Sequence, residues 1–269
     1  MRVLLTNDDG IFAPGMLALR ERAGALGEVT VVAPVDQQSG SSHAFSFHQP
    51  AGVKAAQRDG AFFGHVVRGT PVDCVKLAVA VLLDRKPDVV LSGINDKANL
   101  GISVLYSGTV AAAVEAALMG IHGIAVSIGE EGEPDLDYAA GLACDLAREA
   151  VARPRPRPVL LNVNVPALPR DRIRGVKWIR HNVAPYTERF RPVGGEDDWK
   201  QYQIYGVAGP REQVLRVRGP DPAAAADGPG DGPSDGPGDD VAAFLDGYVT
   251  ITPLRIDFTD HDELASRSG

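Results

Sequence analysis

The stretch Val3-Leu4-Leu5-Thr6-Asn7-Asp8-Asp9-Gly10 decides the fold class. A short apolar run ends in a polar loop, and Pro14 then opens a helical stretch to about Leu26, since proline suits a first helical turn. A second, β-branched run follows at 29–33. Short apolar strands joined through helices are typical of a parallel sheet covered on both faces. This stretch therefore predicts the first unit of an α/β domain.

The same alternation continues along the first 170 residues. Further strands are expected at 88–91, 124–128 and 159–165, and further helices at 70–82, 107–119 and 135–151. Residues 44–69 fit no such unit and are predicted to form a strand excursion or hairpin. The pattern predicts a three-layer, Rossmann-like α/β core over residues 1–170, with a mostly parallel sheet.

The pattern changes after residue 170. Short strands are expected at 177–180, 201–205, 213–217 and 249–251, without clear helices between them, so residues 171–269 are predicted to form a β-rich extended arm. Residues 227–240 contain only Asp, Gly, Pro and Ser. Such a segment buries too little apolar surface to offset its ordering entropy, so a mobile acidic insertion is expected at 221–240.

Composition narrows the function classes. The 269 residues carry 27 Lys and Arg against 35 Asp and Glu, a net charge of −8, which argues against a dedicated nucleic-acid binder. Cys74 and Cys144 are too few for a disulfide framework and are expected to be buried thiols in a reducing compartment. The N-terminal apolar run, Val3 to Leu5, is too short for a signal-peptide core, and no run approaches the length of a membrane span. A cytoplasmic protein without a membrane partner is expected.

Polar residues follow three of the predicted strands. Asp8 and Asp9 follow the first strand, Ser39 lies in the loop after the second, and Asn95 follows the third. Ligands bind beyond the carboxyl ends of the strands in open α/β sheets, so these residues are expected to converge. Their oxygen-only donors suit Mg²⁺, Mn²⁺ or Ca²⁺. Taken alone, the Asn-Asp-Asp-Gly motif is explained equally well as a turn with helix capping.

A candidate anion site lies at the start of the third predicted helix. Ser107, Gly108 and Thr109 open this helix, and free N–H groups at a helix start bind anions. The alternative is an ordinary serine N-cap. The sequence has neither a Walker-type loop nor a Gly-x-Gly-x-x-Gly after the first strand, which argues against a nicotinamide or flavin cofactor. A cation beside an anion site indicates phosphoryl chemistry.

Seven blocks of the chain, in this order, resemble the SurE (survival protein E) family of 5′-nucleotidases. They are Leu4-Leu5-Thr6-Asn7-Asp8-Asp9-Gly10-Ile11, Ala33-Pro34 through Ser39-Gly40-Ser41-Ser42, Arg68-Gly69-Thr70-Pro71-Val72-Asp73-Cys74-Val75, Ser92-Gly93-Ile94-Asn95, Tyr106-Ser107-Gly108-Thr109-Val110-Ala111-Ala112, Asn162-Val163-Asn164-Val165-Pro166 and Gly247-Tyr248-Val249-Thr250-Ile251-Thr252-Pro253-Leu254. The resemblance covers nearly the full chain apart from the acidic insertion.

The resemblance implies a metal-dependent phosphatase acting on nucleoside 5′-monophosphates, with 3′-monophosphates as further substrates. It also implies a homodimer or homotetramer formed through the C-terminal arm. One divalent ion per subunit would bind four residues, two of them catalytic, and the phosphate would bind four others. The metal ligands would be Asp8, Asp9, Ser39 and Asn95, the catalytic pair Asp8 and Asp9, and the phosphate ligands Asn99, Ser107, Gly108 and Thr109.

Three residues near these motifs could act in the site or have only a structural role, and the structural role is favoured for each. Lys97 stands where the family usually has glycine, and a solvated side chain is favoured over a phosphate contact. His43 is interpreted as a surface or supporting residue rather than a general acid. Glu115 is interpreted as a buried, hydrogen-bonded carboxylate rather than a catalytic one. Four aromatic residues are expected to contact a second subunit rather than a base: Tyr186, Phe190, Trp199 and Tyr202.

Two other functions remain open alongside the nucleotidase. One is a non-catalytic nucleotide-binding module, with Lys97 marking lost turnover; ligand would then stabilise the protein without phosphate release. The other is a phosphatase specialised for a different phosphate ester. Measuring turnover of nucleotides and of other phosphate esters distinguishes the nucleotidase from a phosphatase with a different substrate.

Overall fold

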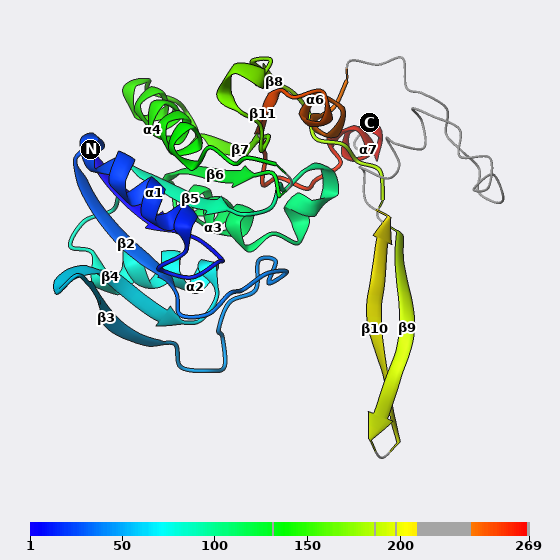
Figure 1. The fold of residues 1–269 in the computed structure, drawn as a ribbon. Coiled ribbons are helices and arrows are strands. Elements are labelled where there is room, and N and C mark those ends of the chain that lie inside the picture. Colours follow the sequence, from blue (N-terminus) through cyan, green and yellow to red (C-terminus); the bar gives the residue numbers. More distant parts are fainter. Residues whose placement is uncertain (131, 186, 197, 209–237, 268–269) are drawn as a thin grey trace.

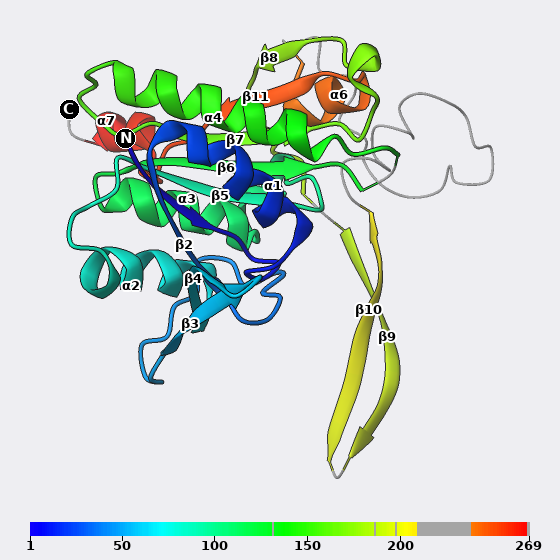
Figure 2. The same cartoon turned by 60° about the vertical axis from the view of Figure 1, so that its left-hand side comes forward.

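The computed structural model describes residues 1–130, 132–185, 187–196, 198–208 and 238–267 (Figure 1). A layered α/β body carries a long two-stranded hairpin that projects away from it (Figures 1 and 2). Within the described part of the chain, none of the helices is both long and apolar enough to cross a membrane.

The strands and helices alternate through most of the body. The strands are β1 (Arg2–Thr6), β2 (Glu28–Pro34), β3 (Gly52–Arg58), β4 (Ala61–Arg68), β5 (Val89–Asn95), β6 (His122–Ile128), β7 (Leu160–Val165), β8 (Val176–Trp178), β9 (Thr187–Glu196), β10 (Trp199–Ala208) and β11 (Val249–Pro253). The α-helices are α1 (Pro14–Ala23), α2 (Pro71–Leu77), α3 (Gly108–Leu118), α4 (Leu136–Ala152), α6 (Asp240–Leu245) and α7 (His261–Arg267).

The body is built on a nine-stranded sheet in the order β3-β4-β2-β1-β5-β6-β7-β11-β8. Strands β4, β2, β1, β5, β6 and β7 run parallel to one another, whereas β3 pairs antiparallel with β4 and β11 pairs antiparallel with β7. Helices α1 and α4 cover one face, and α2 and α3 cover the other (Figure 2). The predicted three-layer, mostly parallel α/β fold is confirmed.

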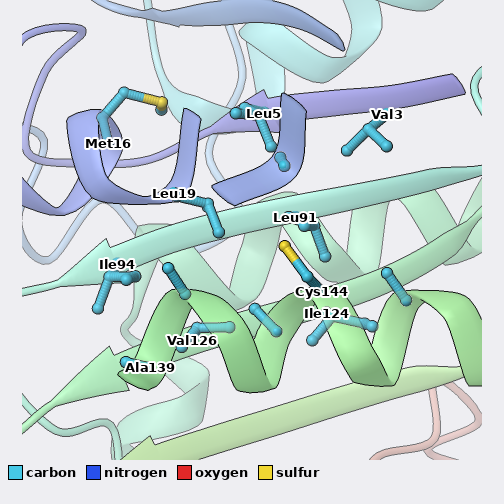
Figure 3. Close-up of a cluster of buried hydrophobic side chains, with 14 of the residues drawn as sticks. Val3, Leu5, Met16, Leu19, Leu91, Ile94, Ile124, Val126, Ala139 and Cys144 are labelled. Carbon is cyan, nitrogen blue, oxygen red and sulfur yellow. The ribbon is translucent and has the colours of Figure 1, made fainter. Parts of the chain in front are cut away.

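The core explains why the parallel strands are apolar along their whole length. On the face covered by α1 and α4, Met16 and Leu19 of α1 lie over Leu5 and Leu91 of the sheet (Figure 3). A second cluster fills the space under α2 and α3. Because both faces are covered, every residue of β5 is buried. Cys74 and Cys144 are buried free thiols, as expected.

The segment 44–69 contains the predicted hairpin. Strands β3 and β4 pair antiparallel, but β4 also pairs parallel with β2 and so extends the main sheet. The hairpin therefore forms one edge of the main sheet and is not separate from it, because β4 is hydrogen-bonded to β2.

The C-terminal region divides between the body and the projecting hairpin. Strands β8 and β11 join the main sheet, while β9 and β10 pair only with each other. The strand expected at 213–217 and most of the acidic insertion lie outside the described residues. The predicted mobile insertion is wrong at its C-terminal end. Asp239 caps α6 by accepting the Ala242 N–H, and Asp240 is fully buried.

Burial of Asp240 has a specific cause. Its carboxylate accepts backbone N–H groups from Gly101 and Asn182, both at 2.8–2.9 Å, and so joins two segments that are distant in sequence. Burial raises the pKa of Asp240 above its usual range. Composition alone could not separate this carboxylate from the acidic residues before it.

Candidate active site

The site lies at the point where the chain order of the sheet reverses. Strand β1 is central, with β2 on one side and β5 on the other, both parallel to it. The loops that leave the carboxyl ends of β1, β2 and β5 therefore meet at one edge, which is where α/β sheets bind ligands. These loops carry Asp8, Ser39 and Asn95 respectively.

Asp8 is joined to the start of α3. The Thr109 hydroxyl donates a hydrogen bond to Asp8 Oδ1, and both residues are buried. Burial raises the pKa of the Asp8 carboxyl, although hydrogen bonds from Thr109 oppose this effect. The contact connects a candidate metal ligand with a candidate phosphate ligand, 101 residues apart in the chain.

The first turn of α3 packs tightly against Asp8. A Cβ atom built on Gly108 would lie 3.0 Å from Asp8 Cβ and 2.8 Å from Ser41 Oγ, so only glycine fits this contact. Ser107 is the N-cap, and its side chain accepts the Val110 N–H at 3.1 Å. The predicted serine cap is therefore present. The predicted anion site involves the same helical turn and stays a prediction.

Asp9 is half-buried in an acidic environment. Its carboxyl lies 3.4 Å from Gln37 Nε2. Burial, together with the neighbouring carboxylates of Asp8 and Asp96, raises the pKa of Asp9 to about 6. A cation bound between two adjacent carboxyl groups favours their ionised forms and offsets the repulsion that raises their pKa values.

The loop after β2 is attached to the Asp8 backbone. Gln38 N–H donates to the Asp8 carbonyl at 2.7 Å, and the exposed Ser39 follows directly. Asn95 is buried at the end of β5, where its Nδ2 donates to the Lys97 carbonyl at 2.5 Å. With the amide nitrogen engaged, the Oδ1 atom is the remaining donor for a ligand.

The donor set consists of carboxylate, hydroxyl and amide oxygens. Among the described residues, no group of three or more His, Cys, Asp or Glu gathers as a metal cluster would. A metal at this edge would use the Ser39 hydroxyl and the Asn95 amide oxygen beside the two aspartates, and oxygen donors of this kind fit a hard divalent ion. These four residues remain a prediction as ligands.

A cavity of about 630 Å³ opens beside Asp9. Its floor is apolar and includes Pro14, Ile94 and Ile128, while its rim includes Lys97 and Glu130. Gly15 lies in the same wall at the start of α1, where an added Cβ would meet the Ile94 carbonyl at 1.9 Å. The close approach of α1 to β5 thus shapes the cavity.

Comparison with known proteins shows the family of this chain. The family model described as "Survival protein SurE" matches residues 3–188. The chain belongs to the SurE family. The 5′-nucleotidase SurE of Syntrophobacter fumaroxidans is 40% identical over 266 residues, covering 97% of this chain and 96% of that protein.

Two further relatives agree with this assignment. The 5′-nucleotidase SurE of Laribacter hongkongensis is 39% identical over 269 residues, covering 98% of this chain and 97% of that protein. The crystal structure of the SurE protein from Aquifex aeolicus superposes with a TM-score of 0.75 at 35% identity, covering 99% of this chain and 98% of that one. The SurE fold therefore extends over almost the whole chain.

In this SurE-family chain, Asn99 lies over the ends of β6 and β7. Its Nδ2 donates to Ser127 Oγ at 2.9 Å, and its backbone N–H donates to Asn164 Oδ1 at 2.7 Å. Its carbonyl accepts Asn162 Nδ2 at 2.7 Å. The roles of Ser127, Asn162 and Asn164 were missed from the sequence. Asparagines at alternate positions of a fully buried strand were the available signal, because they face the same side.

The structure shows the surroundings of Lys97, Glu115 and His43, for which a structural role was expected. Lys97 is exposed, and its Nζ lies 3.2 Å from Glu130 Oε1, which agrees with the solvated reading. Glu115 is a buried, hydrogen-bonded carboxylate, as predicted, and His43 supports it at 2.9 Å. Lys76 also contacts Glu115, at 2.7 Å, and was not singled out from the sequence.

The C-terminal aromatic residues do not reach the site. Phe190, Trp199 and Tyr202 lie on the β9–β10 hairpin, which projects from the body, and all three are exposed (Figure 1). Within one chain, these three residues therefore form no base-stacking wall at the site. Tyr186 lies outside the described residues.

Proposed function

We propose that this protein is a phosphomonoesterase that hydrolyses nucleoside 5′-monophosphates, and also 3′-monophosphates, to nucleoside and phosphate. The observation that carries the proposal is the contact of Asp8 with Thr109. It holds an acidic pair against the first turn of α3, where helix N–H groups are available to an anion. The names of the relatives, 5′-nucleotidase SurE, support the same activity.

We infer that one divalent ion per subunit, Mg²⁺ or Mn²⁺ before Ca²⁺, is held by Asp8, Asp9, Ser39 and Asn95. When bound, such an ion screens the phosphate charge and polarises the P–O bond. The raised pKa of Asp9 and the free Oδ1 of Asn95 support this assignment.

Residues of the chain bind the phosphate, accommodate the nucleoside and orient the attacking water. The N–H groups at Gly108 and Thr109 bind phosphoryl oxygens and stabilise the charge that develops on them. Asn99, fixed by β6 and β7, supports the same phosphate. The cavity beside Asp9 has room for the nucleoside, since ligand pockets span about 300–1,000 Å³. Asp9 faces this cavity and orients the attacking water.

The hairpin is proposed to contact a second copy of the chain, giving a homodimer or homotetramer. It buries little of its own surface, and Trp199 is 79% exposed. A cytoplasmic location is proposed as well, because two buried free thiols suit a reducing compartment.

The first test measures phosphate release from a panel of nucleoside monophosphates with Mg²⁺, Mn²⁺, Ca²⁺ or EDTA. We expect metal-dependent release that falls by at least about a hundredfold in Asp9→Asn, which loses a ligand charge and the residue that orients water. Asp59→Asn is the matched control, because Asp59 lies exposed in the β3–β4 turn.

Three outcomes separate the hypotheses. Full activity in Asp9→Asn contradicts the proposed role of Asp9. Release from other phosphate esters but not from nucleotides moves the substrate to another ester. Thermal stabilisation by nucleotides without release with any of the metals supports a binding module instead.

A further inference from the structure

The buried carboxylate of Glu115 connects three separate segments. Glu115 lies on α3, His43 in the loop after β2, and Lys76 on α2. Its Oε2 is 2.9 Å from His43 Nε2, and its Oε1 is 2.7 Å from Lys76 Nζ. A buried carboxylate is strongly unfavourable without such partners. These three residues, the Glu115 cluster, include none of the candidate metal ligands and have no assigned role in the reaction.

The cluster fastens a loop that has no regular secondary structure. Ser42 in this loop donates its hydroxyl to the Leu105 carbonyl at 2.6 Å, and Thr70 donates its hydroxyl to the Ala44 carbonyl at 2.7 Å. Asp73 accepts Ser46 N–H at 2.8 Å. Side-chain contacts therefore fix the loop from residue 42 to 46 against α2 and the approach to α3.

Ser41 lies directly before this fastened segment and faces the candidate site. Its Oγ is buried and has no hydrogen-bond partner among the described residues. The same Oγ is 2.8 Å from the position of a Cβ on Gly108, and Asp8 Oδ2 is 3.1 Å from that position. A hydroxyl that has lost water without gaining a partner is costly, so it is a donor available to a ligand.

We propose that the Ser41 hydroxyl is a further phosphate-binding group of this site, and that the Glu115 cluster is the positioning element that holds Ser41 against Gly108. The proposal rests on the proposed function for the identity of the ligand, a phosphate monoester or its phosphate product. Ser41 donates to a phosphoryl oxygen bound at the start of α3. His43, Glu115 and Lys76 act through the loop and do not touch the substrate.

The test measures binding of inorganic phosphate, by calorimetry on the metal-loaded full chain, together with kcat and KM for a nucleoside monophosphate. Ser41→Ala is expected to weaken phosphate binding about tenfold or more, the effect of losing one hydrogen bond to a charged group. Ser92→Ala is the matched control, because the Ser92 hydroxyl is equally buried and without a partner but lies within β5.

A double-mutant cycle tests the positioning role. Glu115→Gln is expected to weaken phosphate binding in the same direction. In the Ser41→Ala background it is expected to add little, because residues that act through one another are not additive. His43→Gln and Lys76→Met loosen the cluster from its exposed sides and provide the same test if Glu115→Gln does not fold.

The contradicting outcomes are distinct. Unchanged phosphate affinity in Ser41→Ala overturns the role of Ser41. Fully additive losses, or a fall in thermal stability with phosphate affinity and KM unchanged, overturn the positioning role. A wild-type protein that binds phosphate through Ser41 but hydrolyses no nucleotide refutes the proposed function and leaves this inference standing.

Discussion

Lys97 lines the cavity beside Asp9, but its ammonium group is already paired with a carboxylate. Its ammonium pairs with Glu130, and the side chain is 62% exposed. Its carbonyl, which any residue supplies, is the group that accepts Asn95 Nδ2. The backbone of this position therefore matters to the site more than its side chain.

The first prediction concerns Lys97→Met. We expect kcat/KM to change by less than about threefold, because an exposed ion pair contributes little. The measurement is steady-state hydrolysis at two salt concentrations, with Lys200→Met on the projecting hairpin as a control for the lost charge. A loss of tenfold or more, on the order of 1.4 kcal/mol, would place the ammonium on the substrate.

The second prediction concerns the pH dependence of stability through Glu115. Burial raises the pKa of Glu115, but the contacts with His43 and Lys76 outweigh it and hold the pKa below its usual range. A carboxyl whose pKa is lowered by folding stabilises the protein above its unfolded pKa, near 4.5, and this contribution is lost as pH falls through the folded pKa.

Thermal unfolding of wild type and Glu115→Gln from neutral to acidic pH tests this sign. We expect a lower Tm in the variant near pH 7, with a gap that narrows as pH falls below about 4.5. Glu21→Gln is the control, because Glu21 is exposed on α1. A gap that is constant or widens toward acid would show that the Glu115 charge does not stabilise the fold.

At the scale of elements, α3 carries the most demanding contact. Its first turn approaches Asp8 and Ser41 so closely that a Cβ at Gly108 requires neighbouring atoms to move. Apart from Glu115, the rest of the helix is apolar and mostly buried, and it packs against β5 and β6. Its interior supports the fold, and its start supports the site.

The third prediction compares two glycine substitutions in helices. Gly108→Ala is expected to reduce kcat/KM by at least about a hundredfold, because displacement of reacting groups by about 1 Å has effects of that size. Gly141→Ala in α4 has open space around the added Cβ and is expected to stabilise by about 0.5–1 kcal/mol without loss of activity. Kinetics and chemical denaturation measure both. Normal turnover by a folded Gly108→Ala would contradict the tight-contact account.

At the scale of the whole molecule, the β9–β10 hairpin is the element that projects from the body. Its strands pair only with each other and extend beyond the body (Figures 1 and 2). Several of its apolar side chains are exposed. An isolated two-stranded hairpin is marginally stable in water, so such a projection is typical of an element that is covered by a partner.

The fourth prediction follows from that exposure. Replacing Phe190, Trp199 and Tyr202 together by serine is expected to lower the mass measured by light scattering to that of one chain. The Tm of the body is expected to change little, because β9 and β10 pair only with each other and not with the main sheet. Phe62→Ser, at an exposed site on β4, is the control. An unchanged mass would exclude the hairpin as the interface.

Local sequence determined much of the fold. The apolar runs gave the parallel strands, and Pro14, Ser107 and Asp135 marked helix starts that the structure retains. The sequence also predicted the edge at which Asp8, Ser39 and Asn95 gather, because parallel strands bring their carboxyl ends to one side. These features depend on residues close together in the chain and on a general rule of topology.

Tertiary structure alone decided the contacts that complete the site. The bond from Thr109 to Asp8 spans 101 residues, and His43 meets Glu115 across 72 residues. Asp240 reads as part of an acidic tract, yet it is buried because Gly101 and Asn182 donate to it. No local pattern encodes such pairs: a charged side chain becomes a buried ligand or a support only when distant segments supply the partners that offset its desolvation.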